Sequence, residues 1–200
     1  MPQGWISDMC DPLGRLRIIT GASHLYPLDV TAAYIGPSPN HQNGRVSSIQ
    51  TRFLAGVFSA ARGISLNEAD IAAHRSELQH WMQFAKETAP DMIGGRFDRL
   101  INKDNEVCWQ YTTADKSTVY VAYFHILSAP NLPFRRARMV GLDPEASYLL
   151  AEDGARYYGD ALMHSGLSLP YVTMTHARDG VRYMDKGDFS SYLFVFKKAD

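Results

Sequence analysis

Two carboxylates near the amino end of the chain are the residues best suited to chemistry. Asp8 and Asp11 stand three residues apart, after a short apolar stretch. Asp11 precedes Pro12, which favours the first position of a helix because its missing N–H would have no partner there. Asp11 is therefore expected to cap that helix. Asp8 remains available at the end of the preceding strand, where parallel α/β folds carry catalytic groups. On this evidence alone, an ordinary turn residue is the commoner interpretation of Asp8.

The elements that must position Asp8 alternate between short strands and helices over residues 1–90. This alternation indicates a parallel α/β fold. Three strand–helix units cannot close an eight-stranded barrel, which needs roughly 250 residues. The residues alone therefore leave open a small α/β unit or the last third of a barrel. Beyond the first strand, the pattern predicts strands at about 32–36 and 63–66, and helices at about 12–20, 47–61 and 67–90.

The predicted helices carry start and stop signals. Gly21 fits the left-handed position after the first helix. Asn67 is expected to cap the third helix, with Asp70 as its partner in a variant capping box. Leu66 is expected to staple to Ile71 across the same helix start.

The periodicity changes to two from about residue 94 onward. Alternating β-branched and aromatic residues separated by polar turns predict an antiparallel β-sandwich. We therefore expect a domain boundary near residues 88–95, with one domain over 1–90 and another over 91–200. The expected strands include 107–111, 118–127, 135–139 and 191–197.

Two sequence blocks carry a resemblance to a known family. Trp5-Ile6-Ser7-Asp8-x-x-Asp11 resembles the W-T-S-D-x-x-D segment of glycoside hydrolase family 36, the bacterial α-galactosidases. The block from Ile35 to Arg45 is similar to the family's I-G-P-S-P-x-H-x-T-G-R segment and follows in the family's order and spacing. Similarity continues through residues 132–144. The resemblance implies the last strands and helices of a (β/α)₈ barrel, followed by an antiparallel β-sandwich.

The resemblance also implies a reaction and a role for Asp8. Retaining glycosidases use two carboxyl groups about 5–5.5 Å apart, one as nucleophile and one as acid/base. Asp8 aligns with the family's acid/base. The family's nucleophile lies in a Lys-Trp-Asp stretch, which this chain does not contain. We therefore expect an α-galactosidase-type fragment that acts on melibiose- or raffinose-type sugars only as part of an intact enzyme and uses no cofactor.

Two further residues are candidate contacts to a galactosyl oligosaccharide. Trp5 is a candidate platform for stacking a sugar, or else a packing residue. His41 lies in a loop that either lines the mouth of the sugar site or is tied down by hydrogen bonds of His41 or Arg45. Tyr34 departs from the family, in which many members have histidine at this position.

Composition excludes several function classes. The net charge of −1 and the lack of a basic run argue against nucleic acid or an anionic membrane. No apolar run approaches the ~20 residues of a membrane span. Neither the two cysteines nor the histidines have the spacing of a metal site. A reducing, cytoplasmic location is expected, with possible homo-oligomers. Met1 is expected to correspond to an internal methionine of the family.

Two rival functions remain open. A non-catalytic carbohydrate-binding or assembly module would expose aromatics on one sheet face, with Tyr120 or Tyr192 as candidates. The alternation of Tyr192, Phe194 and Phe196 instead favours a core position. An inactive gene fragment would leave an unpaired edge strand and tend to aggregate.

Overall fold

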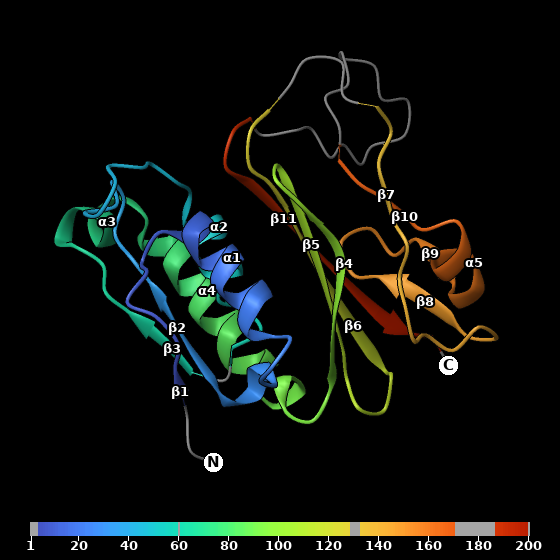
Figure 1. Ribbon diagram of the computed structural model, residues 1–200. Helices are drawn as coiled ribbons and strands as arrows, with labels where there is room; N and C mark the ends of the chain where they lie inside the picture. Colours follow the sequence, from blue (N-terminus) through green and yellow to red (C-terminus); the bar gives the residue numbers. More distant parts are fainter. Residues whose placement is uncertain (1–3, 60, 129–132, 171–186, 200) are drawn as a thin grey trace. The chain divides into compact units, whose positions relative to one another are not determined.

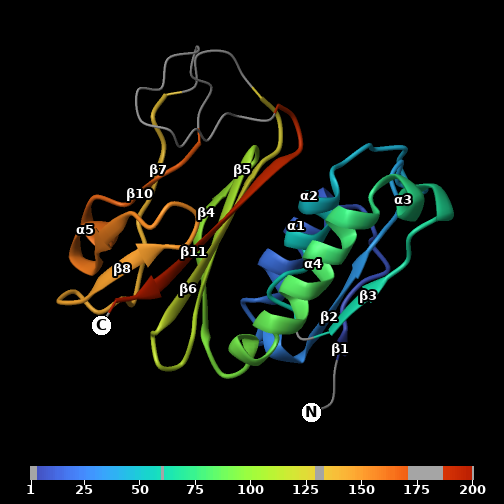
Figure 2. The same ribbon diagram turned by 180° about the vertical axis from the view of Figure 1, so that it is seen from behind.

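A computed structural model describes residues 4–59, 61–128, 133–170 and 187–199. The chain divides into two compact units, Met1–Phe97 and Asp98–Asp200. Figures 1 and 2 show the elements of both units from opposite sides. Among the described residues, no helix is long and apolar enough to span a membrane.

Unit 1 is built on a three-stranded parallel sheet with the order β1-β2-β3. Helices α1, α2 and α4 lie on one face of this sheet (Figures 1 and 2). Each helix connects or follows strands in chain order, which is the expected strand–helix alternation. The elements are β1 (Gly4–Trp5), α1 (Pro12–Ala22), η1 (Leu28–Val30), β2 (Thr31–Ile35), α2 (Ile49–Leu54), β3 (Ala61–Ile64), α3 (Glu68–Ala73), α4 (Arg75–Thr88) and η2 (Pro90–Met92).

The two faces of β2 differ in burial. Thr31, Ala33 and Ile35 are buried, whereas Ala32 and Tyr34 between them are only half-buried. A Cβ added to Gly56, just after α2, would lie 2.8 Å from the Cβ of Ala33. Ala33 therefore faces the helical layer, and Tyr34 projects from the opposite face because side chains alternate along a strand.

The predicted helix caps are confirmed. The Asp11 carboxylate accepts a hydrogen bond from the Gly14 N–H at 2.9 Å, and Pro12 is the first residue of α1. The Asn67 side chain accepts one from the Asp70 N–H at 2.7 Å. Each cap satisfies a backbone donor that a helix start would otherwise leave unpaired.

Other local predictions were wrong. Gly21 lies inside α1, which ends at Ala22. The predicted helix over 47–61 is helical only from Ile49 to Leu54. The third predicted helix is broken into α3 and α4, because His74 leaves the helical conformation at φ −125° and ψ 25°. Asp70 does not close a capping box, because its carboxylate binds distant partners instead.

Unit 2 is an antiparallel β domain. Its six-stranded sheet has the order β4-β5-β6-β11-β8-β9, and a separate two-stranded sheet pairs β7 with β10. The prediction of a parallel α/β segment followed by an antiparallel β domain is therefore confirmed. The elements are β4 (Arg96–Lys103), β5 (Glu106–Thr112), β6 (Thr118–His125), β7 (Arg136–Ala137), β8 (Ser147–Leu150), β9 (Arg156–Tyr158), α5 (Gly159–His164), β10 (Leu167–Ser168) and β11 (Ser190–Lys198).

The core of unit 2 lies between the large sheet and a small second layer. Val121 and Phe194 on the sheet belong to the same buried cluster as Ala137 of β7, Leu162 of α5 and Leu167 of β10. Within the described ranges of unit 2, this second layer consists of a two-stranded ribbon and one short helix.

The two aromatic residues on which a carbohydrate-binding module would depend are both buried. Tyr120 is 4% exposed and Tyr192 is 5% exposed, so neither offers a surface platform. Tyr192, Phe194 and Phe196 are all buried, as their alternation indicated.

Candidate active site

The candidate site lies where two loops meet at the carboxyl end of the parallel sheet. Asp8 follows β1, and the loop that carries His41 and Gln42 follows β2. The Gln42 amide donates to the carbonyl oxygen of Asp8 at 3.4 Å. Its Oε1 accepts from the Cys10 N–H at 3.3 Å. One side chain therefore fixes the backbone on both sides of Met9.

Asp8 is exposed and is oriented by its neighbour Trp5. The indole N–H of Trp5 donates to Oδ1 of Asp8 at 2.8 Å. The Trp5 ring in turn meets the ring of Tyr34 edge to face, with centroids 4.4 Å apart and planes at 77°. Within the described part of the chain, Oδ2 of Asp8 has no hydrogen-bond partner. One carboxylate oxygen is thus held, and the other remains available.

Asp11 has a structural role. It is only 2% exposed, caps α1, and forms an ion pair with Arg45. The ion pair between Asp11 and Arg45 holds the loop after β2 against the loop after β1. This contact agrees with the interpretation that Arg45 ties down its loop. His41 is exposed in the same loop and makes no hydrogen bond or ion pair among the described residues. Its predicted sugar contact therefore rests on its position alone.

Arg15 anchors the backbone of the loop that carries Asp8. It is 1% exposed, and its guanidinium donates to the carbonyl oxygen of Met9. Burial lowers the pKa of Arg15 below its usual value, which the nearby Cys10 partly offsets. Within the described residues, Nε and Nη1 of Arg15 have no hydrogen-bond partner.

Gln42 and Arg15 were not singled out as site residues from the sequence. Arg15 did carry a signal, because it stands four residues before Ile19 and therefore on the apolar face of α1. Gln42 carried none, since a polar residue in a polar loop is the ordinary case.

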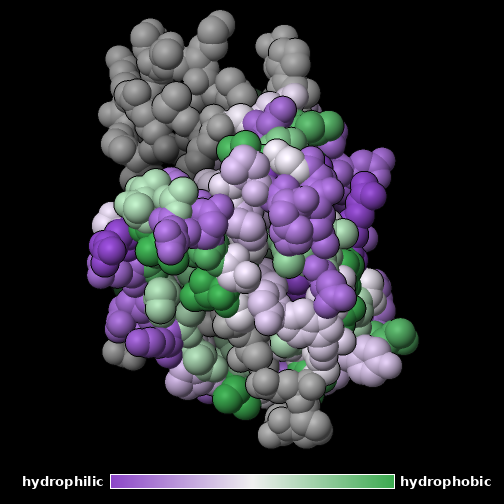
Figure 3. All heavy atoms as spheres, turned by 90° about the vertical axis from the view of Figure 1, so that its left-hand side faces the viewer, coloured by the Kyte–Doolittle hydropathy of each residue, from purple (hydrophilic) through white to green (hydrophobic). Residues whose placement is uncertain are grey.

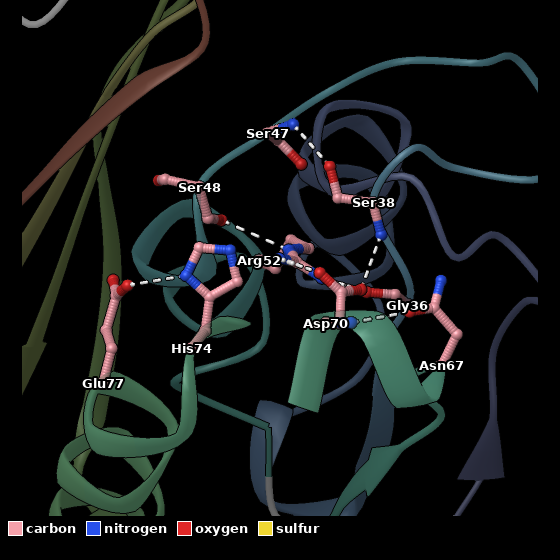
Figure 4. A network of polar contacts seen from close by, with 9 residues as sticks. All are labelled: Gly36, Ser38, Ser47, Ser48, Arg52, Asn67, Asp70, His74 and Glu77. Atoms are coloured by element: carbon pink, nitrogen blue, oxygen red, sulfur yellow. Dashed lines mark hydrogen bonds and ion pairs between the residues drawn. The ribbon is translucent and has the colours of Figure 1, made fainter. Parts of the chain in front are cut away.

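A buried ion pair fixes the start of the loop after β2 (Figure 4). Arg52 and Asp70 form two hydrogen bonds of 2.9 and 3.1 Å, and both side chains are almost fully buried. Arg52 also donates to the Gly36 carbonyl oxygen at 3.0 Å. The Ser38 N–H donates to Asp70 at 2.9 Å. Burial alone would raise the pKa of Asp70, but hydrogen bonds from Arg52 and Ser38 outweigh it and hold that pKa below its usual value.

The acidic residues near the site differ in their partners. Asp11 and Asp70 are each paired with an arginine. Asp29 belongs to η1, which immediately precedes β2 and therefore lies toward the amino end of the sheet. Of the three aspartates at the carboxyl end, Asp8 is the one without a cationic partner among the described residues. No group of three or more potential metal-ligating side chains occurs in the described ranges.

Comparisons with known proteins give a consistent relationship. The Melibiase family matches residues 1–95, and the glycosyl hydrolase family 36 C-terminal domain matches residues 106–196. Alpha-galactosidase AgaA of Geobacillus stearothermophilus is 36% identical over 177 residues, which are 86% of this chain and 24% of that relative. The bifunctional alpha-galactosidase/sucrose kinase AgaSK of Mediterraneibacter gnavus is 32% identical over 178 residues, covering 86% of this chain and 19% of that protein.

Solved structures agree with these matches. A variant of AgaA in complex with raffinose superposes with a TM-score of 0.86 and 31% identity, over 100% of this chain and 26% of that one. The α-galactosidase of Lactobacillus brevis gives 0.85 and 30% identity, over 99% of this chain and 26% of its own. This chain spans about a quarter of the length of these solved relatives. The Melibiase match covers the α/β unit, and the C-terminal-domain match covers the antiparallel β unit that follows it. The chain therefore belongs to glycoside hydrolase family 36.

Proposed function

We propose that this chain is the C-terminal part of a retaining α-galactosidase that removes terminal α-galactosyl residues from melibiose- or raffinose-type sugars. The observation that carries the proposal is the placement of Asp8 at the carboxyl end of the parallel sheet, exposed and with Oδ2 available. A relative that binds raffinose supports the substrate class. In this proposal, residues 1–90 complete a (β/α)₈ barrel and residues 91–200 form the β-sandwich after it.

Asp8 is the acid/base of the proposed reaction. As acid it protonates the glycosidic oxygen while the bond to the anomeric carbon breaks, and as base it then removes a proton from the attacking water. The exposed face of Trp5 and the His41 side chain contact the sugar. The reaction uses no cofactor, because the carboxyl pair supplies both the nucleophile and the proton.

The chain supplies one member of that pair. The nucleophile must stand about 5–5.5 Å from the acid/base. Asp11 and Asp70 are engaged with arginines, and the chain has no Lys-Trp-Asp stretch. The nucleophile therefore comes from the part of the enzyme that the relatives have beyond these residues.

We predict that the isolated 200-residue chain does not hydrolyse 4-nitrophenyl α-galactoside. The measurement is release of nitrophenolate from the purified chain, beside the Asp8→Asn variant. Turnover that disappears in Asp8→Asn would show that the chain carries a complete carboxyl pair, against this prediction.

A chimera tests the role of Asp8 directly. Residues 1–200 of this chain replace the matching quarter of AgaA, whose remaining part supplies the other carboxylate. Asp8→Asn is expected to lower kcat/KM for raffinose about 10²–10⁴-fold, the usual contribution of a general acid. The same variant should lose less activity toward dinitrophenyl α-galactoside in the first chemical step, because the leaving group of this substrate needs no proton. Asp29→Asn is the control and should keep activity; an active Asp8→Asn chimera would refute the proposed role.

A further inference from the structure

Asp8 stands at the end of a line of contacts that crosses all three strands of the parallel sheet. Trp5 of β1 pairs with Ala32 of β2, and Tyr34 stands two residues further along the same face. Tyr34 in turn pairs with Gly63 of β3. Because Gly63 has no side chain, the ring of Tyr34 lies over its backbone. A Cβ at Gly63 would meet three Tyr34 ring atoms at 3.0–3.1 Å.

The contacts along this line leave little freedom to the Trp5 ring. Tyr34 touches it edge to face at a centroid distance of 4.4 Å, an arrangement that aromatic pairs favour. The indole N–H then points to Oδ1 of Asp8 at 2.8 Å. Trp5 is 51% exposed, so packing against Tyr34, rather than deep burial, orients it.

We infer that Trp5 is a positioning residue for Asp8, supported by Tyr34 and Gly63, and that it assigns the transferable proton to Oδ2. An indole nitrogen can only donate a hydrogen bond. Oδ1 must therefore remain an acceptor whether Asp8 is ionised or protonated. The carbonyl oxygen of a neutral carboxyl group is a better acceptor than its hydroxyl oxygen, so the proton of the neutral acid resides on Oδ2, the oxygen without a partner among the described residues.

The catalytic part of this inference rests on the proposed function. In the first step, the O–H bond at Oδ2 breaks and its proton passes to the glycosidic oxygen, which takes the electrons of its bond to the anomeric carbon. The nucleophilic carboxylate of the intact enzyme forms a bond to that carbon. In the second step, Oδ2 takes a proton from water as the water oxygen displaces that carboxylate.

The positioning itself is testable in the 200-residue chain, independently of activity. The chain has three tryptophans, so a ¹⁵N-labelled sample should show three indole signals in its ¹H–¹⁵N spectrum. The Trp5 signal, identified by its loss in Trp5→Phe, is expected to move in Asp8→Asn, because a neutral amide replaces the carboxylate that accepts from the indole N–H. The other two signals should keep their positions in Asp8→Asn and so report that the fold persists. A Trp5 signal that is unchanged in Asp8→Asn overturns the inference.

A substitution at Gly63 tests whether the packing of Tyr34 on β3 helps to orient the Trp5 ring. Gly63→Ala is expected to move the Trp5 indole signal at constant pH, because the Tyr34 ring must yield by a few tenths of an ångström. Gly21→Ala is the matched control, since a Cβ there meets nothing within 4 Å. An unchanged Trp5 signal in Gly63→Ala would exclude Gly63 from the supporting line. Tyr34→Ala serves as a second variant in case Gly63→Ala does not fold.

Kinetics of the AgaA chimera separate this inference from the proposed function. Trp5→Phe keeps the ring and removes the donor, and should lower kcat/KM for raffinose about tenfold, typical of losing a hydrogen bond to a charged group. The loss should be smaller for dinitrophenyl α-galactoside, whose leaving group needs no proton from Asp8. If Asp8→Asn leaves activity intact, the proposed function fails. If Asp8→Asn abolishes activity but Trp5→Phe does not lower kcat/KM for raffinose, the positioning role fails.

Discussion

At the scale of single residues, the most deeply buried ion pair in the described part of unit 1 joins Arg52 and Asp70. Both side chains are almost fully buried and joined by two hydrogen bonds. Such a pair adds little net stability compared with apolar packing, but breaking one half leaves a buried charge without a partner. Here the pair also binds the backbone at Gly36 and Ser38, and so fixes the loop that carries His41 and Gln42.

Asp70→Asn is therefore expected to destabilise the protein by about 3–5 kcal/mol. The measurement is urea unfolding followed by tryptophan fluorescence. Glu68→Gln, an exposed carboxylate at the start of α3, is the control and should change stability by less than about 0.5 kcal/mol. Equal effects of the two variants would contradict the structural role of the pair.

The same carboxylate makes stability depend on pH. The pKa of Asp70 lies below its usual value in the folded protein, because hydrogen bonds from Arg52 and Ser38 outweigh its burial. Its stabilising contribution is therefore complete above the usual aspartate pKa of about 3.9 and is lost as pH falls through the lowered value. Asp70→Asn should lack this part of the acid dependence.

At the scale of secondary-structure elements, a single glutamine joins the two layers of unit 2. Gln110 of β5 is completely buried. Its amide donates to the Val140 carbonyl oxygen at 2.7 Å and accepts from the Val140 N–H at 3.1 Å. The side chain thus pairs with backbone as a neighbouring strand would. It ties the segment after β7 to the large sheet.

Gln110→Leu is expected to destabilise the protein by about 2 kcal/mol or more, because it leaves backbone groups of Val140 without partners. Urea unfolding measures the change, with Gln83→Leu on the exposed face of α4 as the control. A variant as stable as the parent would mean that water replaces the amide at no cost.

At the scale of the whole molecule, the parallel sheet of unit 1, as far as the structure describes this unit, has edges at β1 and β3. Beside β3 lies an open, mostly apolar groove of about 380 Å³. Figure 3 shows hydrophobic patches between hydrophilic ones on this side of unit 1. An unpaired parallel edge next to apolar surface favours association with other chains. The groove is lined by Ile64, Leu66, Ile71, Arg75, Leu78, Gln79 and Met82.

We predict that the 200-residue chain self-associates as its concentration rises, and that Ile64→Lys reduces this association. Ile64 lies on β3 and is 44% exposed, so a lysine there blocks edge pairing without disturbing the core. Ile93→Lys is the matched control, since Ile93 is 62% exposed but lies outside the strands. Light scattering across a concentration series distinguishes the two; equal effects would point to general charge repulsion.

The sequence by itself determined the two helix caps, the fold classes and the family. Asp11 caps α1 and Asn67 caps α3, because a cap depends on residues within one turn of the helix. The change from strand–helix alternation to period two predicted both fold classes. Blocks around Asp8 and His41 identified the family. The roles of Asp8, Trp5 and His41 remain predictions.

Only the tertiary structure decided which polar residues meet. Asp70 looked like a capping-box residue, yet it binds Arg52, which lies 18 positions earlier in the chain. Gln110 stands in an alternating stretch, yet every residue of β5 is buried. Gln42 reaches Asp8 and Cys10 across more than 30 residues. Contacts of this kind depend on how strands are ordered and loops are folded, and a linear pattern records only neighbours along the chain.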